Sequence, residues 1–137
     1  MNGPTPDAGA AQPVVNPFGN LIGWRVLERH NGQSRYTLHV DAHHMNPNGV
    51  LHGAVLFALA DNGMGSALTT LLGPDELCAS ITVNIAFLRP VFSGELVCAT
   101  RVVQRGGRVA FLESEIKQGD TLVAKASGTF SIFKTKA

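Results

Sequence analysis

One helical stretch, residues 53–72, most constrains the fold of this chain. Its large apolar residues recur three and four positions apart, as on one face of a helix, and most of its other positions are Ala, Gly or Ser. Gly73-Pro74 ends the pattern. Strand-like runs lie on both sides: two around the turn Asn31-Gly32, and four over residues 78–90, 95–106, 107–119 and 120–134. One long helix followed by consecutive hairpins predicts an α+β fold, an antiparallel sheet with the helix packed on one face.

The 137 residues suit one domain, which we expect over residues 17–137, and 45% of them are hydrophobic, enough for a sizeable core. Residues 18–24 are expected to form a short helical turn at its entry. Residues 1–16 are rich in Pro, Gly and Ala and lack the basic and apolar segments of a signal peptide. They are predicted to form a disordered tail.

A net charge of +1 does not indicate binding to nucleic acid, and the sequence has no run of basic residues of the kind that binds a membrane surface. The longest apolar run, residues 50–72, is interrupted by His52, Asp61, Asn62 and several glycines, unlike a transmembrane helix. We therefore expect neither nucleic acid nor a membrane as a partner.

Cys78 and Cys98 both fall in apolar strand-like runs, and their spacing matches no zinc pattern. We expect two reduced core thiols in a cytoplasmic protein rather than a disulfide. Possible metal ligands cluster along one segment, without the spacing of a helical metal motif: His39, Asp41, His43, His44 and His52. The sequence therefore predicts no metal site.

Asp61 lies two turns into an otherwise apolar helix, where a carboxylate needs a partner or a chemical role. Gly53 stands at the first turn of that helix, where backbone N–H groups lack partners and the dipole is positive. A glycine there lets a ligand approach the backbone, so its N–H is a candidate oxyanion donor. Asn46 and His52 lie in the loop just before it.

Eight residues separate Gly53 from Asp61, which is ~12 Å along a helix axis. A base and an oxyanion donor must meet within about 3 Å of one reacting centre. Two copies of the helix, antiparallel around a two-fold axis, would satisfy this, and the small residues on its surface suit such an approach. The sequence therefore predicts an obligate dimer with two composite sites.

The segment NPNGVLHGAVLFALAD, residues 46–61, resembles the signature of the hotdog-fold thioesterases of the phenylacetate-degradation type: an Asn-Pro pair, a His-Gly at the helix start and an Asp eight residues after the Gly. NIAFLRP, residues 84–90, resembles the third strand of that family and its Arg-Pro end. The resemblance covers residues 19–133. One departure is Ala54, where the family most often carries a second glycine.

The resemblance implies a hotdog fold, a curved antiparallel sheet wrapped around one long central helix, and hydrolysis of acyl-CoA thioesters to the free acid and coenzyme A without a cofactor. By the same resemblance, Asp61 attacks the thioester or activates water, and Gly53 supplies the oxyanion N–H. His52 helps to fix the loop and the thioester carbonyl. Asn46 holds the water or the carbonyl, and Ser80 places the water near Asp61.

The resemblance also implies that coenzyme A lies along a subunit interface, with contacts from Phe87, Arg89, Pro90, Gly106, Gly107 and Arg108. We expect the acyl pocket on the apolar face near Asp61, lined by Val50, Leu56, Met64 and Phe87. The acyl group, small aryl or medium-chain, stays open. The separation of Gly53 and Asp61 along the helix predicts a homodimer, and the resemblance implies a homotetramer made of two such dimers.

Other interpretations remain. Asp61 as a structural carboxylate, His52 as a loop histidine and Asn46 as a turn residue need no chemistry. A serine hydrolase lacks support, because there is no G-x-S-x-G elbow and no histidine after residue 52. A hotdog hydratase or dehydratase would pair His52 with Asp61 across the dimer. A non-catalytic acyl-CoA-binding or sensing protein would have no need for an ionisable group beside the thioester.

Overall fold

The computed structural model describes residues 16–135. Two short elements come first, α1 (Pro17–Ile22) and β1 (Arg25–His30), followed by β2 (Gln33–His39) and the 3₁₀ turn η1 (Ala42–His44). The remaining elements are α2 (Gly53–Thr69), β3 (Glu76–Phe87), β4 (Glu95–Arg105), β5 (Val109–Gln118) and β6 (Thr121–Lys134). The predicted order of strands and helix is confirmed. The predicted tail over residues 1–16 falls outside the described residues except for Asn16, which instead caps α1 by accepting a hydrogen bond from the Gly19 N–H.

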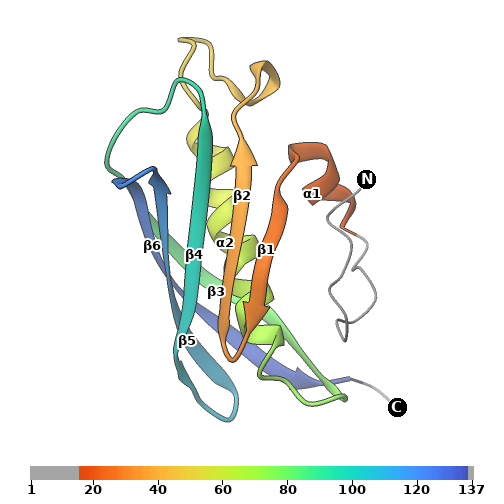
Figure 1. Cartoon of the computed structure of the whole chain (residues 1–137). Helices are drawn as coiled ribbons and strands as arrows, with labels where there is room; N and C mark the ends of the chain where they lie inside the picture. Colours follow the sequence, from red (N-terminus) through yellow and green to blue (C-terminus); the bar gives the residue numbers. More distant parts are fainter. Residues whose placement is uncertain (1–15, 136–137) are drawn as a thin grey trace.

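The strands form one six-stranded antiparallel sheet in the order β1-β2-β4-β5-β6-β3. The sheet curves around α2, which lies along its concave side (Figure 1). This is the curved sheet and central helix that the sequence predicts. The helix ends earlier than expected, at Thr69, because the Thr70 N–H bonds back to Ala67 and Leu68 and the chain then turns into β3.

The core is the contact between α2 and the concave side of the sheet. A helix that is apolar nearly all round is usually buried, and α2 follows that rule on the sides that the sheet reaches. The largest fully buried side chains come from both layers: Leu38, Leu59, Met64, Leu68, Leu96, Leu112 and Ile116. No helix within residues 16–135 has the length and apolarity needed to cross a membrane.

β3 is an edge of the sheet and is paired only with β6 in this chain. Its concave side carries alternate residues from Cys78 to Phe87, which pair with buried β6 residues. Several of its side chains are nevertheless exposed, among them Ser80, Ile81 and Phe87. A β-bulge interrupts the register between Ser80 and Thr82. Because an edge this long leaves a row of backbone groups unpaired, it is a template for a further strand.

Both cysteines are free, as predicted. Cys98 lies in the core, whereas Cys78 is only half-buried. The difference follows from their strands, because β4 is internal to the sheet and β3 is its edge. Burial raises the pKa of the Cys98 thiol to about 11.

Candidate active site

The start of α2 presents backbone N–H groups, and His52 caps it. The His52 Nδ1 accepts a hydrogen bond from the Ala54 N–H at 2.9 Å, and the His52 carbonyl accepts one from the Val55 N–H at 3.0 Å. Since Nδ1 accepts, the proton of the neutral ring is on Nε2, and the exposed ring offers it as a donor. The Gly53 N–H has no such local acceptor, as expected for a first helical turn. Two donors, the Gly53 N–H and the His52 Nε2–H, are thus available at this helix start.

Asn46 organises the loop before α2. Its Oδ1 accepts from the Asn48 N–H at 2.8 Å and from the Val50 N–H at 3.1 Å, and its own N–H donates to the Val50 carbonyl at 2.7 Å. Asn46 therefore has a structural role in this turn, and its role toward water or a carbonyl stays a prediction. Its Nδ2 group is not used in this turn, so a ligand contact from Asn46 would be as a donor.

Asp61 is in the middle of α2, on the side that faces away from the centre of the sheet. Partial burial raises the pKa of its carboxyl group above the usual range, and the nearby Ser80 hydroxyl lowers it in part. Burial raises the pKa of the Cys78 thiol, two residues before Ser80 on β3, the Thr69 hydroxyl lowers it in part, and the Asp61 charge raises it further. A carboxylate with a raised pKa is a candidate base or nucleophile. The predicted placing of Ser80 near Asp61 agrees with this arrangement.

Gly53 and Asp61 open into different hollows of the chain. The first, of about 380 Å³, contains Gly53 and four of the predicted substrate contacts, Val50, Phe87, Arg89 and Pro90. A Cβ on Gly53 would lie 3.1 Å from the Phe87 ring, so β3 ends directly beside the start of α2. The second hollow, of about 500 Å³, contains Asp61. Within one chain, the Gly53 N–H and the Asp61 carboxylate therefore lie in separate hollows, as their distance along the helix predicts.

The hairpin with Gly106, Gly107 and Arg108 lies at the far end of β3 from these contacts. The Arg105 guanidinium pairs with Glu76, the first residue of β3, at 2.7 Å, and the Arg108 carbonyl accepts from the Ile132 N–H at 2.7 Å. Phe87 is the last residue of β3, ~36 Å further along the strand. The predicted coenzyme A contacts thus fall into two groups that one chain does not bring together.

The hollow beside Asp61 includes residues that the sequence analysis did not select: Asn16, Phe18, Trp24, Ala54, Phe57, Ala58 and Asn62. The Asn16 amide donates to Asn62 Oδ1 at 3.3 Å and holds the start of α1 against α2. The Asn16-Pro17 pair marks a helix start and could have indicated α1. Its position over Asp61 depends on tertiary contacts that no local pattern shows.

None of the four residues expected in the acyl pocket lines the hollow beside Asp61. Met64 is fully buried in the core, where its sulfur packs against Gly128, and it lines neither hollow. Leu56, like Val50 and Phe87, lines the hollow of Gly53 rather than that of Asp61. Met64, three positions after Asp61, and Leu56, five positions before it, are both buried in the core.

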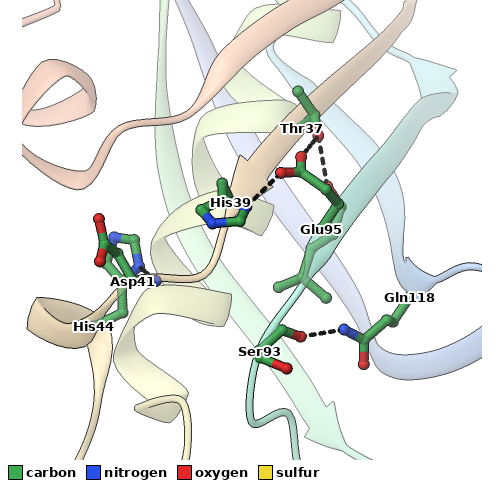
Figure 2. A network of polar contacts seen from close by, with 8 residues as sticks. Thr37, His39, Asp41, His44, Ser93, Glu95 and Gln118 are labelled. Carbon is green, nitrogen blue, oxygen red and sulfur yellow. Dashed lines mark hydrogen bonds and ion pairs between the residues drawn. The ribbon is translucent and has the colours of Figure 1, made fainter.

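The histidines near the loop are engaged in protein contacts. His44 is buried, with Nδ1 accepting from the Asp41 N–H at 2.9 Å and Nε2 bonded to the Ile22 carbonyl at 2.6 Å. His39 pairs with Glu95 at 2.6 Å, and Glu95 also accepts from Thr37 (Figure 2). Within residues 16–135 no group of three His, Cys, Asp or Glu side chains is placed to hold a metal ion.

Comparison with known proteins gives the family. Residues 48–125, more than half of the chain, match the Thioesterase superfamily. A Pseudomonas aeruginosa protein named "Putative esterase PA0474" is 34% identical over 123 residues, which cover 89% of this chain and 90% of that protein. The chain belongs to the thioesterase superfamily and has its hotdog fold, of the type found in the phenylacetate-degradation proteins.

Two solved structures show how close the fold is. The conserved protein PA5202 from Pseudomonas aeruginosa superimposes with a TM-score of 0.84 at 35% identity, covering 87% of this chain and 95% of that one. A variant of the phenylacetic acid degradation protein PaaI from Thermus thermophilus gives a TM-score of 0.79 at 28% identity, covering 85% and 98%.

Proposed function

We propose that this protein hydrolyses acyl-CoA thioesters in two composite sites of a homodimer. The observation that carries the proposal is the relation between α2 and β3. The two elements run in opposite directions, with Gly53 beside Phe87 at one end and Asp61 beside Ser80 further along. Any two-fold operation that brings Ser80 opposite the partner's Phe87 therefore also brings Asp61 toward the partner's Gly53.

The free edge of β3 supplies that operation. Two β3 strands that pair antiparallel, with the axis at Asn84, place Ser80 of each strand opposite Phe87 of the other when the bulge between Ser80 and Thr82 is counted. The six-stranded sheets then join into one continuous sheet, and the open sides of the two α2 helices face each other. Ala54, Ala58 and Asp61 lie on this open side beside the larger Phe57, and the two alanines leave room for a partner helix.

The same axis explains the split coenzyme A contacts. With this register the partner's Glu76 falls opposite Val91. The partner's hairpin 106–108, held to Glu76 through Arg105, then comes beside Arg89 and Pro90. Arg89 and the partner's Arg108 are thereby available to the phosphates of one coenzyme A, since guanidinium groups bind phosphate oxygens well.

The chemistry follows from the donors and the carboxylate. Asp61 takes a proton from water, and the oxygen of that water attacks the thioester carbon. The carbonyl oxygen becomes an oxyanion and accepts from the Gly53 N–H, with His52 Nε2–H as a second donor. The C–S bond then breaks, and the leaving thiolate takes the proton from Asp61, giving the free acid and coenzyme A. Direct attack by Asp61, followed by hydrolysis of the resulting anhydride, gives the same products.

No cofactor takes part in this scheme, because the chain supplies both the base and the oxyanion donors. The two free thiols suit a reducing compartment, and we place the protein in the cytoplasm. The tetramer implied by the resemblance would consist of two such dimers, and light scattering distinguishes two chains from four.

The test is thiol release from a panel of aryl and aliphatic CoA esters by the wild type and by Asp61→Asn. Release that the variant loses, while it still binds coenzyme A, supports the function. Mixing Asp61→Asn chains with Gly53→Ala chains should restore activity in verified heterodimers, since one of the two sites is then intact. Hydration of an enoyl ester without thiol release would favour a hydratase, and binding without turnover would favour a sensor.

A further inference from the structure

The sheet beneath Asp61 carries a cluster of buried hydroxyl and thiol groups, which we call the polar seat. It consists of Ser34 on β2, Cys98 and Thr100 on β4, and Ser114 on β5, which are 0%, 0%, 4% and 1% exposed. Thr100 Oγ1 and Ser114 Oγ lie 2.7 Å apart, and Cys98 Sγ lies 3.8 Å from Thr100 Oγ1. Four adjacent polar groups in the centre of a hydrophobic core call for an explanation.

The polar seat contacts the backbone of α2. The Ser34 hydroxyl donates to the Gly63 carbonyl at 2.7 Å, and the Cys98 thiol donates weakly to the Leu59 carbonyl at 3.8 Å. The lack of a side chain on Gly63 makes this contact possible, because a Cβ there would lie 2.6 Å from Thr100 Oγ1. The helix main chain is therefore held directly by the sheet, through a hydrogen bond rather than through packed side chains alone.

Asp61 lies midway between these two anchored carbonyls along the helix. At 3.6 residues per turn, its side chain points ~160–200° away from Leu59 and Gly63, toward the open side of α2. A carboxylate at ~6 Å from the axis moves ~1 Å when the helix rotates by ~10°. A displacement of about 1 Å in a reacting group can cost ~100-fold in rate. The rotation of α2 is thus a sensitive variable for the site.

We propose that Ser34 is a positioning residue, whose hydrogen bond to the Gly63 carbonyl fixes the rotation of α2 and with it the place of the Asp61 carboxylate. Apolar residues at these four positions would give an equal or greater free energy of unfolding, because buried polar groups are costly to desolvate. Apolar contacts have no preferred direction, whereas a hydrogen bond constrains both distance and angle. The hydrogen bond from the polar seat therefore orients α2, and with it the Asp61 carboxylate that the proposed reaction uses.

Among the neighbours of Asp61, the hydrogen-bonding group that acts on its carboxyl is the Ser80 hydroxyl. From β3, the Ser80 hydroxyl lowers the pKa of Asp61 that burial raises, and the Asp61 charge adds to the effect of burial in raising the pKa of the Cys78 thiol. The hollow on its other side is lined by Asn16 and Asn62 and by aromatic and alanine side chains, none of them charged. With no ion pair among these neighbours, the position of the carboxylate depends on the helix that carries it.

The test compares Ser34→Ala with Thr37→Ala. Thr37 is a matched control, because it is a buried hydroxyl on the same strand whose Oγ1 donates to the Leu96 carbonyl at 3.0 Å and not to α2. We expect Ser34→Ala to lower kcat about tenfold or more with KM changed less than twofold. Thr37→Ala should leave both constants unchanged. Equal kcat values for Ser34→Ala and the wild type would overturn the inference.

A second measurement does not depend on activity. The inference rests on the proposed thioesterase function only for its kinetic consequence. The pKa of Asp61, followed by the NMR shift of its carboxyl carbon, should fall toward the ordinary aspartate value in Ser34→Ala, since a freed helix lets the carboxylate move toward water. It should stay in place in Thr37→Ala. A wild type that releases no thiol refutes the function alone, whereas an unmoved Asp61 pKa in Ser34→Ala refutes the positioning role.

Should Ser34→Ala fail to fold, a compensating pair tests the same contact. Gly63→Ala pushes α2 off the seat through the clash with Thr100 Oγ1, and Thr100→Ala removes the clashing atom. We expect Gly63→Ala to lower kcat and the double variant Gly63→Ala/Thr100→Ala to regain at least half of the loss. A double variant that recovers its melting temperature but not kcat would contradict the proposal.

Discussion

Gly53 and Asp61 lie on the same helix, yet each opens into a different hollow of the chain. The Gly53 hollow contains the end of β3 and the Arg89-Pro90 pair. The Asp61 hollow contains α1 and Trp24. A site made from both halves has to be assembled from two chains, and the consequences can be measured one residue at a time.

Asp61→Asn should remove activity and add stability. Loss of a general base lowers the rate by ~100- to 10,000-fold. Burial raises the pKa of Asp61 in the folded state, so its ionisation opposes folding. This penalty is absent below the unfolded-state pKa of about 3.9 and complete above the folded-state pKa. The variant should therefore melt at a higher temperature than the wild type at pH 7, with the difference vanishing near pH 3. The exposed Asp120→Asn is the control, and a lower melting temperature for Asp61→Asn at pH 7 would contradict the argument.

Ser80→Ala should move the acid limb of the pH–rate profile upward. The Ser80 hydroxyl lowers the pKa of Asp61, so its removal lets burial act without opposition. Activity requires the ionised carboxylate and should then be lost at a higher pH as the pH falls, while the plateau at high pH is less affected. Ser131→Ala, which removes a hydroxyl that donates to the Ala79 carbonyl of the same strand, should leave the limb in place. An unshifted limb would show that Ser80 does not act on Asp61, and a shift to lower pH would contradict the sign of its effect.

Two substitutions separate the structural role of His52 from its chemical role. His52→Ala loses the acceptor for the Ala54 N–H and should cost ~1 kcal/mol of unfolding free energy. His52→Asn keeps a good capping acceptor but lacks the Nε2–H donor, so it should be nearly as stable as the wild type and much less active. Urea unfolding and thiol release measure the two effects. Full activity in His52→Asn would limit His52 to capping.

Ile81→Lys should separate the dimer. Ile81 is 56% exposed on β3, and a lysine on a pairing edge disfavours strand addition. Leu27→Lys is the matched control, since Leu27 is 46% exposed on β1, the opposite edge of the sheet. Light scattering should give monomers for Ile81→Lys and the wild-type assembly for Leu27→Lys. Monomers that keep full activity would remove the need for a composite site.

Local patterns were sufficient for the elements and for the separation of Gly53 from Asp61. The apolar periodicity of α2, the Asn31-Gly32 turn and the hairpin junctions depend on neighbouring residues, and the distance along a helix depends only on its rise. The side-chain contacts were harder to predict. Asn46 was open between a turn and a ligand contact, and the structure shows that its oxygen serves the turn.

The polar seat could not be predicted, for a physical reason. Ser34 lies two residues before Tyr36 and four before Leu38 on β2, so its side chain is on the same inward face of the strand. A serine on a strand is nevertheless ordinarily expected to be exposed. Its partner Gly63 is distant in sequence, and the neighbouring hydroxyls come from two further strands. Only the folded sheet brings them together.

The two edges of this sheet differ in length and in polarity. β3 has twelve residues and several exposed apolar side chains, whereas β1 has six, of which Arg25, Glu28, Arg29 and His30 are polar. When the β3 edges of two chains pair through a two-fold axis, neither β3 edge is left free. What remains at both ends of the joined sheet is β1, short and charged, which discourages another strand. In the proposed dimer, growth along the sheet therefore stops at two chains, and the β3 edge is no longer open to pairing into fibres.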